Sequence, residues 1–238
     1  MKLIAFESSA KAASAALLED GRLVGESYLN NGLTHSRTLL KLAQDLLENC
    51  GWKPADVDAA AYANGPGSFT GIRIGVAAAK GFCWGMELPC VPVSTLEAMA
   101  YARLDLTGTV CCCMDARRDQ VYNAVFSVTD RGPVRLRDDR AISIAELAED
   151  LQTFPGDIYL VGDGAALVYE ALGGQIPGLH LTAEHLRQQR ASGVALAAWE
   201  TAKAGKAVSA ALPLPNYLRL SQAERERLAR LQSKEKGE

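Results

Sequence analysis

The chain has 238 residues, of which 25 are Lys or Arg and 28 are Asp or Glu, giving a formal net charge of −3. A chain with this net charge lacks the excess of positive charge expected of a protein that binds RNA or DNA without a partner. No apolar stretch of about 20 residues is present to span a bilayer. The apolar run before Glu7 is too short for a signal peptide. We therefore expect a cytoplasmic protein without a membrane segment, whose six cysteines are free thiols.

The first half of the sequence predicts three strands followed by alternating helices and strands. Asp20-Gly21, between the second and third strands, is a strong hairpin signal. Leu39, Ala43 and Leu46 mark the apolar stripe of the first helix. In chain order, the predicted strands are 2–6, 12–18, 22–29, 57–63 and 90–93, and the predicted helices are 35–50, 69–86 and 95–103.

The second half repeats this order of elements without visible sequence identity to the first. An acidic residue ends the first strand of each half (Glu7 and Asp115), and a glycine turn follows the fourth strand of each (Gly65 and Gly162). The predicted strands are 109–114, 120–128, 134–141 and 157–161, and the predicted helices are 144–151, 165–172 and 191–203.

Three antiparallel strands continued by strand–helix units predict a mixed sheet flanked by helices, here in two copies. The doubled order is typical of the actin-like (ASKHA, ribonuclease H-like) α/β fold, in which ATPases hold nucleotide between two lobes. We expect an N-terminal actin-like lobe at 1–106, a C-terminal actin-like lobe at 107–220 and a charged tail at 221–238.

The turn at 65–75 carries the most informative motif, Gly-Pro-Gly-Ser-Phe-Thr-Gly-Ile-Arg-Ile-Gly. A glycine turn before a helix can bring free N–H groups and the positive end of the helix dipole to an anion. The candidate phosphate loop consists of Gly65, Gly67, Ser68 and Thr70. An ATPase would also need an Asp and a small-residue hairpin at the end of the first strand. Since the chain has Glu7 there and no glycine after it, we interpret the loop as vestigial and expect no cofactor.

No catalytic or metal-binding constellation follows from the residue spacing. None of His35, His180 and His185 forms the i, i+4 pair of a helical zinc site. Ser68 does not lie in a Gly-x-Ser-x-Gly nucleophile elbow, and a helix N-cap at Ser68 or Thr70 explains these residue types more simply. We therefore assign no catalytic residue and no metal ligand.

The predicted helix at 69–86 carries small residues on one side. Gly67, Gly71, Gly75 and Ala79 recur every four residues, and each glycine inside a helix costs about 1 kcal/mol relative to alanine. The spacing therefore predicts that another surface approaches this side of the helix closely. That surface is either the chain's own sheet or another subunit.

The 65–75 motif, continued by the alanine-rich segment to Gly81, closely resembles the signature of the bacterial TsaB (YeaZ) family. Five further segments keep the order and spacing of the family, and the resemblance covers about residues 2–220. Glu7 stands where the family usually has Asp, and Arg37 stands where it usually has Glu. The five segments are 34–36, 93–98, 115–122, 162–164 and 215–219.

The resemblance implies a role in forming threonylcarbamoyladenosine in tRNAs that read codons starting with A. In that system TsaB is the non-catalytic partner of its paralogue TsaD, TsaC makes the threonylcarbamoyl-adenylate intermediate, and TsaE is an associated ATPase. TsaD has a His-x-x-x-His metal-binding pair in the region matching Thr95 to Met99, where this chain has neither histidine. We therefore expect a scaffold subunit, not an enzyme, that stabilises a TsaD-like partner and reaches tRNA only through the complex.

The family dimerises, with itself or with TsaD, through helices that correspond here to 35–50 and 69–86. The resemblance thus implies a homodimer when the chain is alone, with the small side of the second helix packed across subunits. The implied interface residues are His35, Leu39, Leu46, Gly71, Gly75, Ala78 and Phe82. Two other functions stay open: a metal-independent peptidase, as related proteins have been described, and a small-molecule ATPase or kinase of the actin and sugar-kinase class.

Overall fold

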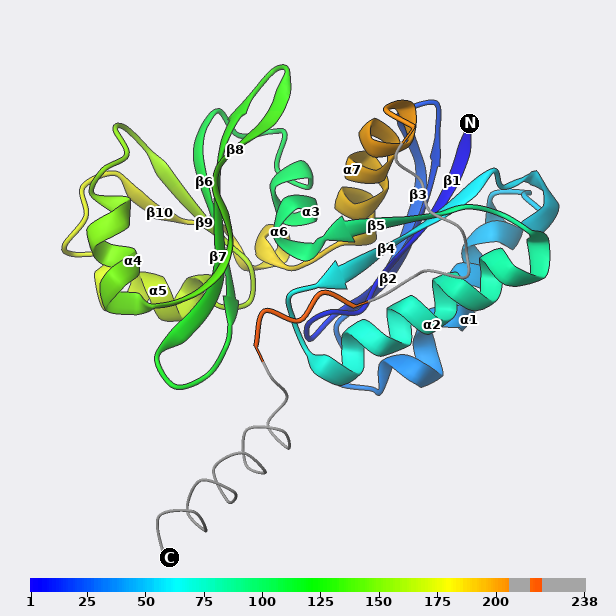
Figure 1. Ribbon diagram of the computed structural model, residues 1–238, viewed down its shortest axis with the longest axis horizontal. Helices are drawn as coiled ribbons and strands as arrows, with labels where there is room; N and C mark the ends of the chain where they lie inside the picture. The colour runs from blue at the N-terminus through cyan, green and yellow to red at the C-terminus, as the bar shows by residue number, and fades with distance from the viewer. Residues whose placement is uncertain (206–214, 220–238) are drawn as a thin grey trace, which may run out of the picture.

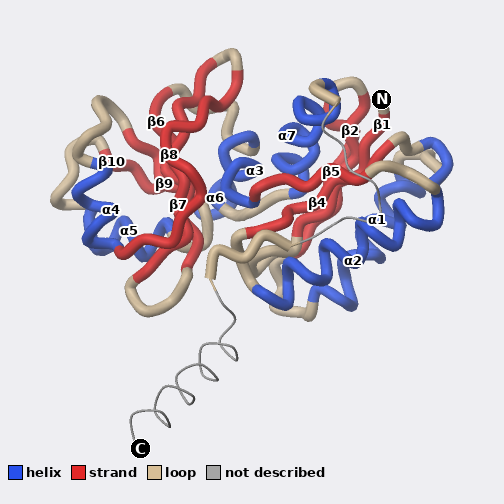
Figure 2. Tube along the Cα trace, in the orientation of Figure 1, coloured by secondary structure: helices blue, strands red, loops and turns tan. Residues whose placement is uncertain are grey.

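The computed structural model describes residues 1–205 and 215–219, which form two lobes lying side by side (Figure 1). Each lobe is built on one five-stranded sheet. In both lobes the strands lie at the centre and the helices lie outside them (Figure 2).

The first sheet has the strand order β3-β2-β1-β4-β5. Its central strand β1 pairs antiparallel with β2 and parallel with β4. Because alternate residues of a strand face opposite ways, Ile4 and Phe6 pack under α1 and α2, whereas Leu3 and Ala5 pack under α7. The elements of this lobe are β1 Lys2–Glu7, β2 Ala13–Glu19, β3 Arg22–Leu29, α1 His35–Asn49, the short 3-10 helix Pro54–Asp56, β4 Ala59–Gly65, α2 Phe69–Met86, β5 Cys90–Ser94 and α7 Ala191–Lys203.

The second sheet has the order β10-β9-β6-β7-β8, which matches the first sheet when it is read from β8. Here β6 takes the place of β1, since it pairs antiparallel with β7 and parallel with β9. Cys111 and Cys113 face the core under α4 and α5, together with Leu147. The elements are β6 Gly108–Asp115, β7 Gln120–Thr129, β8 Gly132–Ser143, α4 Ile144–Leu151, β9 Ile158–Val161, α5 Ala165–Leu172, β10 Leu179–Leu181 and α6 Glu184–Arg187.

Helix α3 (Thr95–Tyr101) joins the two lobes and lies between them (Figure 1). Its Ala98 belongs to the α7 core of the first lobe, whereas Leu96 and Met99 belong to the core under the second sheet. The absence of a side chain at Gly193 lets α7 approach the carbonyl oxygen of Ala98, where a Cβ atom would overlap it. One short helix therefore contributes to both hydrophobic cores.

The two mixed sheets with flanking helices confirm the predicted actin-like fold and the repeated order of elements. One part of the predicted domain division needs correction, because α7 lies within 107–220 but packs on the first sheet. The buried residues Ala191, Val194 and Ala195 are small or β-branched and fit against Leu3 and Ala5. The predicted tail at 221–238 lies outside the described residues.

The cysteines behave as predicted, since all six are free and five of them are buried. Within the described ranges, no helix combines the length and the apolar character that crossing a membrane requires.

Candidate functional site

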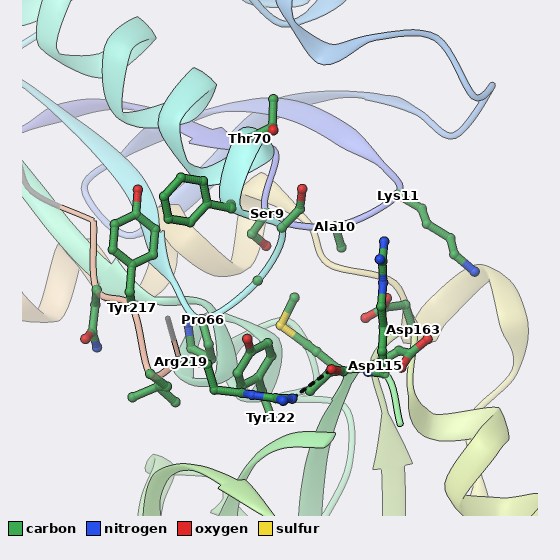
Figure 3. Close-up of a pocket in the computed structure, with 18 residues that line it drawn as sticks. Ser9, Ala10, Lys11, Pro66, Thr70, Asp115, Tyr122, Asp163, Tyr217 and Arg219 are labelled. Atoms are coloured by element: carbon green, nitrogen blue, oxygen red, sulfur yellow. Dashed lines mark hydrogen bonds between the residues drawn. The ribbon is translucent and has the colours of Figure 1, made fainter. Parts of the chain in front are cut away.

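A cavity of about 550 Å³ lies between the two lobes (Figure 3). Its lining includes Lys11 and Thr70 from the first lobe and Asp115, Arg117 and Asp163 from the second. The C-terminal segment 216–219 forms part of the same lining. The cavity is therefore polar, contains charges of both signs, and is built from three separate parts of the chain.

Three residues of the candidate phosphate loop, Gly67, Ser68 and Thr70, line this cavity, but the loop is packed against the chain itself. Gly65 has φ +120 and lies so close to Asn216 that a Cβ atom would overlap the carbonyl oxygen of that residue. At Gly67 a Cβ atom would overlap the carbonyl oxygen of Ser9, which also accepts a hydrogen bond from the backbone N of Ser68 at 2.6 Å. The glycines thus make room for protein backbone, and one of the N–H groups expected to face an anion is already bonded.

Ser68 acts as the N-cap of α2, as its residue type predicts. Its Oγ accepts a hydrogen bond from the backbone N of Gly71 at 3.2 Å. Thr70, in the first turn of the helix, remains exposed and faces the cavity.

The acidic residue at the end of β1 is fully buried. Oε1 of Glu7 accepts a hydrogen bond from the backbone N of Ser9 at 2.6 Å, whereas Oε2 has no hydrogen-bond partner among the described residues. Burial, with a smaller contribution from the nearby charge of Asp163, raises the pKa of Glu7 to about 7, although hydrogen bonds from Ser9 and Ser8 lower it. Burial also raises the pKa of Asp163, although its carboxylate accepts a hydrogen bond from Gln189. In the described part of the chain, no three His, Cys, Asp or Glu side chains are grouped so that they could hold a metal ion.

The small side of α2 faces inward, against the turn that follows β1. At Gly71 a Cβ atom would overlap the carbonyl oxygen of Ser8, and at Gly75 it would lie 2.8 Å from Ser8 Oγ. Ser8 Oγ in turn donates to the carbonyl oxygen of Gly71 at 2.9 Å. Of the two alternatives that the sequence left open, the structure favours the chain's own backbone: the turn after β1 lies against Gly71 and Gly75, so these glycines do not offer a free face to a partner.

Most of the other predicted interface residues also pack within the chain. Leu39, Leu46 and Ala78 are buried in the core under α1 and α2. Phe82 is half-buried and packs on that core, with its ring centroid 6.3 Å from that of Phe6. His35 is half-buried, and its Nε2 lies 2.8 Å from the carbonyl oxygen of Ala10. The seven residues are therefore mainly the inward side of the two helices.

The outward side of α1 and α2 carries exposed residues that are not in the predicted interface set, and we call it the α1–α2 outer face. Trp84 is 66% exposed and Leu40 is 58% exposed. Ala77 and Gly81 are exposed as well, and the space around a Cβ atom at Gly81 is empty to 4 Å. Helical periodicity could have identified this face from the sequence, because Ala77, Gly81 and Trp84 lie on the side of the helix opposite to Gly71 and Gly75.

Arg37, one of the two departures from the family pattern, is exposed near the start of α1. It therefore borders the outer face, whereas Glu7, the other departure, lies in the interior behind the cavity.

Comparison with protein families gives a match to the model described as TsaD, tRNA N6-adenosine threonylcarbamoyltransferase, over residues 32–227. Among curated proteins, the tRNA threonylcarbamoyladenosine biosynthesis protein TsaB of Escherichia coli K12 is 35% identical over 167 residues, which are 69% of this chain and 72% of the relative. The protein of the same name from Bacillus subtilis is 28% identical over 227 residues, covering 94% of this chain and 96% of the relative.

Solved structures agree with these relatives. YeaZ from Pseudomonas aeruginosa superimposes with a TM-score of 0.77 at 29% identity and covers 91% of this chain and 99% of its own. A second structure, an uncharacterized protein from the same organism with similarity to peptidase YeaZ, gives a TM-score of 0.78 at 28% identity, with 92% and 99% coverage. On the matched family model, the curated relatives and the shared fold, this chain belongs to the TsaB (YeaZ) family.

Proposed function

We propose that this chain is a scaffold subunit in the biosynthesis of threonylcarbamoyladenosine in tRNA, and that it binds and stabilises a catalytic TsaD-like paralogue. The proposed role follows the names of the Escherichia coli and Bacillus subtilis relatives. The observation that carries the scaffold function is the α1–α2 outer face, where a largely exposed tryptophan adjoins small residues on a long helix. Such a protein would work in the cytoplasm and reach tRNA only within the complex.

The shape of the outer face suits helix-on-helix packing with a partner. Ala77 and Gly81 leave room for a partner's side chains beside the α2 backbone, and Trp84 offers a large apolar anchor of the kind that dominates binding energy at interfaces. In the absence of the paralogue, a second copy of the chain would use the same face in a two-fold symmetric dimer. Self-association and binding of the paralogue would then compete, and a TsaE-like ATPase would join the assembled pair.

A mixing experiment tests this proposal. The chain and the TsaD-like paralogue from the same organism should co-elute in size-exclusion chromatography at micromolar concentration. Trp84→Glu should weaken the association at least 30-fold in calorimetric titration, because a buried interface anchor contributes about 2 kcal/mol or more. Val134→Glu provides the matched control, since Val134 is 60% exposed but lies on β8 of the second lobe.

The outcomes separate the proposal from its alternatives. Failure of the native proteins to co-elute would contradict the scaffold role. Co-elution with equal weakening by both variants would place the interface elsewhere. Unchanged thermal unfolding of Trp84→Glu shows that a lost interaction is not a folding defect.

The second candidate function is a small-molecule ATPase or kinase, and the interlobe cavity is the observation that favours it. The contacts of Gly67 and Ser68 with Ser9 argue against it, because they occupy part of the loop that a phosphate would need. Tight binding of ATP to the isolated chain in calorimetry would support this function over the scaffold.

A peptidase is the remaining alternative, since one of the related structures is described as similar to a peptidase. Turnover of a peptide substrate by chain shown to be free of contaminating proteases would support it.

A further inference from the structure

Residues 215–219, here called the latch, contact both lobes and form part of the wall of the cavity between them. In the ribbon view the latch is the short orange-red segment that passes between the lobes (Figure 1). No element of regular secondary structure lies within it. Its position is therefore set by side-chain and backbone contacts with the rest of the chain.

The first-lobe end of the latch is anchored at the glycine turn. The backbone N of Asn216 donates to the carbonyl oxygen of Asn64 at 2.6 Å. The carbonyl oxygen of Asn216 packs against Gly65, at a position that a side chain would fill. Part of the glycine motif thus serves to accommodate a segment about 150 residues further along the chain.

An aromatic stack at the start of α2 strengthens this anchor. The ring of Tyr217 stacks on Phe69 with centroids 4.5 Å apart and an interplanar angle of 23°. The guanidinium of Arg73 lies 4.0 Å from the centroid of Phe69, and its Nε donates to Tyr217 Oη at 2.9 Å. Such stacked and cation–π contacts add to the burial of the rings.

The second-lobe end of the latch is anchored at the turn between β6 and β7. Nη1 of Arg219 donates to the carbonyl oxygen of Ala116 at 2.9 Å, and the dashed line in Figure 3 marks this bond. Directly after Ala116, three consecutive non-glycine residues, Arg117, Arg118 and Asp119, have φ values of 64, 58 and 56. L-residues rarely adopt this left-handed conformation, so three in a row persist only where surrounding contacts hold them.

Besides the latch, hydrogen bonds within the second lobe hold the strained turn, one of them from the backbone N of Ile144 to the carbonyl oxygen of Asp119 at 3.1 Å. The backbone N of Ala116 donates to the carbonyl oxygen of Gln120 at 3.0 Å, and the backbone N of Arg117 donates to the Asp115 carboxylate at 2.7 Å. Away from the latch, the lobes are also tied through α3, where Ser94 Oγ donates to Asp139 of β8 at 2.5 Å. Loss of the latch should therefore loosen the cavity walls without separating the lobes.

We propose that the latch couples the two lobes: it holds the strained β6–β7 turn of the second lobe against the glycine turn of the first and so sets the shape of the cavity between them. This inference does not depend on the proposed function. Tyr217 contacts the first lobe and Arg219 contacts the second. Removing the contacts at either end should therefore increase amide hydrogen exchange at the other end.

Amide hydrogen exchange on the full-length chain tests the coupling. Tyr217→Ala removes first-lobe contacts alone, yet it should raise exchange in the turn 116–120 about tenfold, the size expected for one lost hydrogen bond. Arg219→Ala should raise exchange at the same turn and at the backbone N of Asn216, in the first-lobe anchor. Tyr217→Phe keeps the stack and loses one hydrogen bond, so its effect should be smaller.

Two matched controls are available in the chain. Arg131→Ala removes an exposed arginine from the β7–β8 turn of the second lobe, and Tyr169→Ala removes a tyrosine of α5 that is 38% exposed, as Tyr217 is. Neither should change exchange at 116–120. Confinement of the Tyr217→Ala effect to the first lobe would overturn the inference, as would a uniform rise across the whole chain that follows a lower free energy of unfolding.

Discussion

Replacing Gly71 by alanine tests whether the small side of α2 packs inward. In an open helix this change would stabilise the chain by about 1 kcal/mol. At Gly71, however, the new Cβ atom would overlap the carbonyl oxygen of Ser8, so the helix or the β1–β2 turn must shift. Overpacking of this kind typically costs about 1–3 kcal/mol, and the shift would also strain the hydrogen bond from Ser8 Oγ to the Gly71 carbonyl. We expect a net destabilisation of about 2 kcal/mol.

The matched control is Gly81→Ala in the same helix, because among the described residues no atom outside the helix's own backbone lies within 4 Å of a Cβ atom there. This variant should be more stable than the native chain by up to about 1 kcal/mol. Trp52, Trp84 and Trp199 all lie in the first lobe, so tryptophan fluorescence during urea or thermal unfolding reports on that lobe. For a chain of this size, about 2 kcal/mol corresponds to a fall in Tm of about 4–8 °C.

The pair of variants gives a clear refutation. If Gly71→Ala unfolds at the native midpoint or above it, the close contact with Ser8 does not exist in solution. If Gly81→Ala is destabilised instead, the assignment of the buried and exposed sides of α2 is wrong, and so is the proposed outer face.

Three further predictions concern other parts of the chain. Burial raises the pKa of Glu7 to about 7, so between about pH 4.5 and pH 7 the folded state keeps a proton that the unfolded state has lost. The free energy of unfolding should therefore fall as the pH rises from about 4.5 to 7. Glu7→Gln should remove this pH dependence, so the variant should be more stable than the native chain by up to about 3 kcal/mol at pH 8 and equally stable near pH 4. Urea unfolding midpoints that shift equally at both pH values would contradict this prediction. Asn123 is fully buried, donates to the Cys112 carbonyl at 3.0 Å and accepts from Arg140 at 2.9 Å; Asn123→Ala should cost about 2–3 kcal/mol in chemical unfolding, and a cost below about 0.5 kcal/mol would show that these bonds contribute little. Ser143→Ala should cost about 1 kcal/mol by opening the capping box with Glu146, whereas Ser143→Thr should restore most of it in the same assay.

Local patterns were sufficient to predict most of the helices and strands. Ser68 was expected to cap a helix, and its side chain accepts a hydrogen bond from the backbone N three residues on. The hairpin at Asp20-Gly21 turns with φ values of 49 and 81, as the residue types suggest. These features depend on residues within a few positions of one another, so the sequence contains the information that decides them.

Contacts between distant segments were not predictable in the same way. The face of Gly71 is set by Ser8, 63 residues earlier, and the latch meets Arg73 through Tyr217, 144 residues later. Helix α7 packs on the first sheet although it follows the second in the chain.

A row of small residues indicates that bulk is excluded from one side of a helix, but it is the same whether the excluding surface is the chain's own sheet or a partner. The residue types and spacing of this chain therefore decided its family, its repeated α/β order and its glycine turn. Which side of α2 is buried, what the glycines accommodate, and how the C-terminal segment joins the lobes were decided only by the tertiary structure, because each depends on backbone brought close from far along the chain.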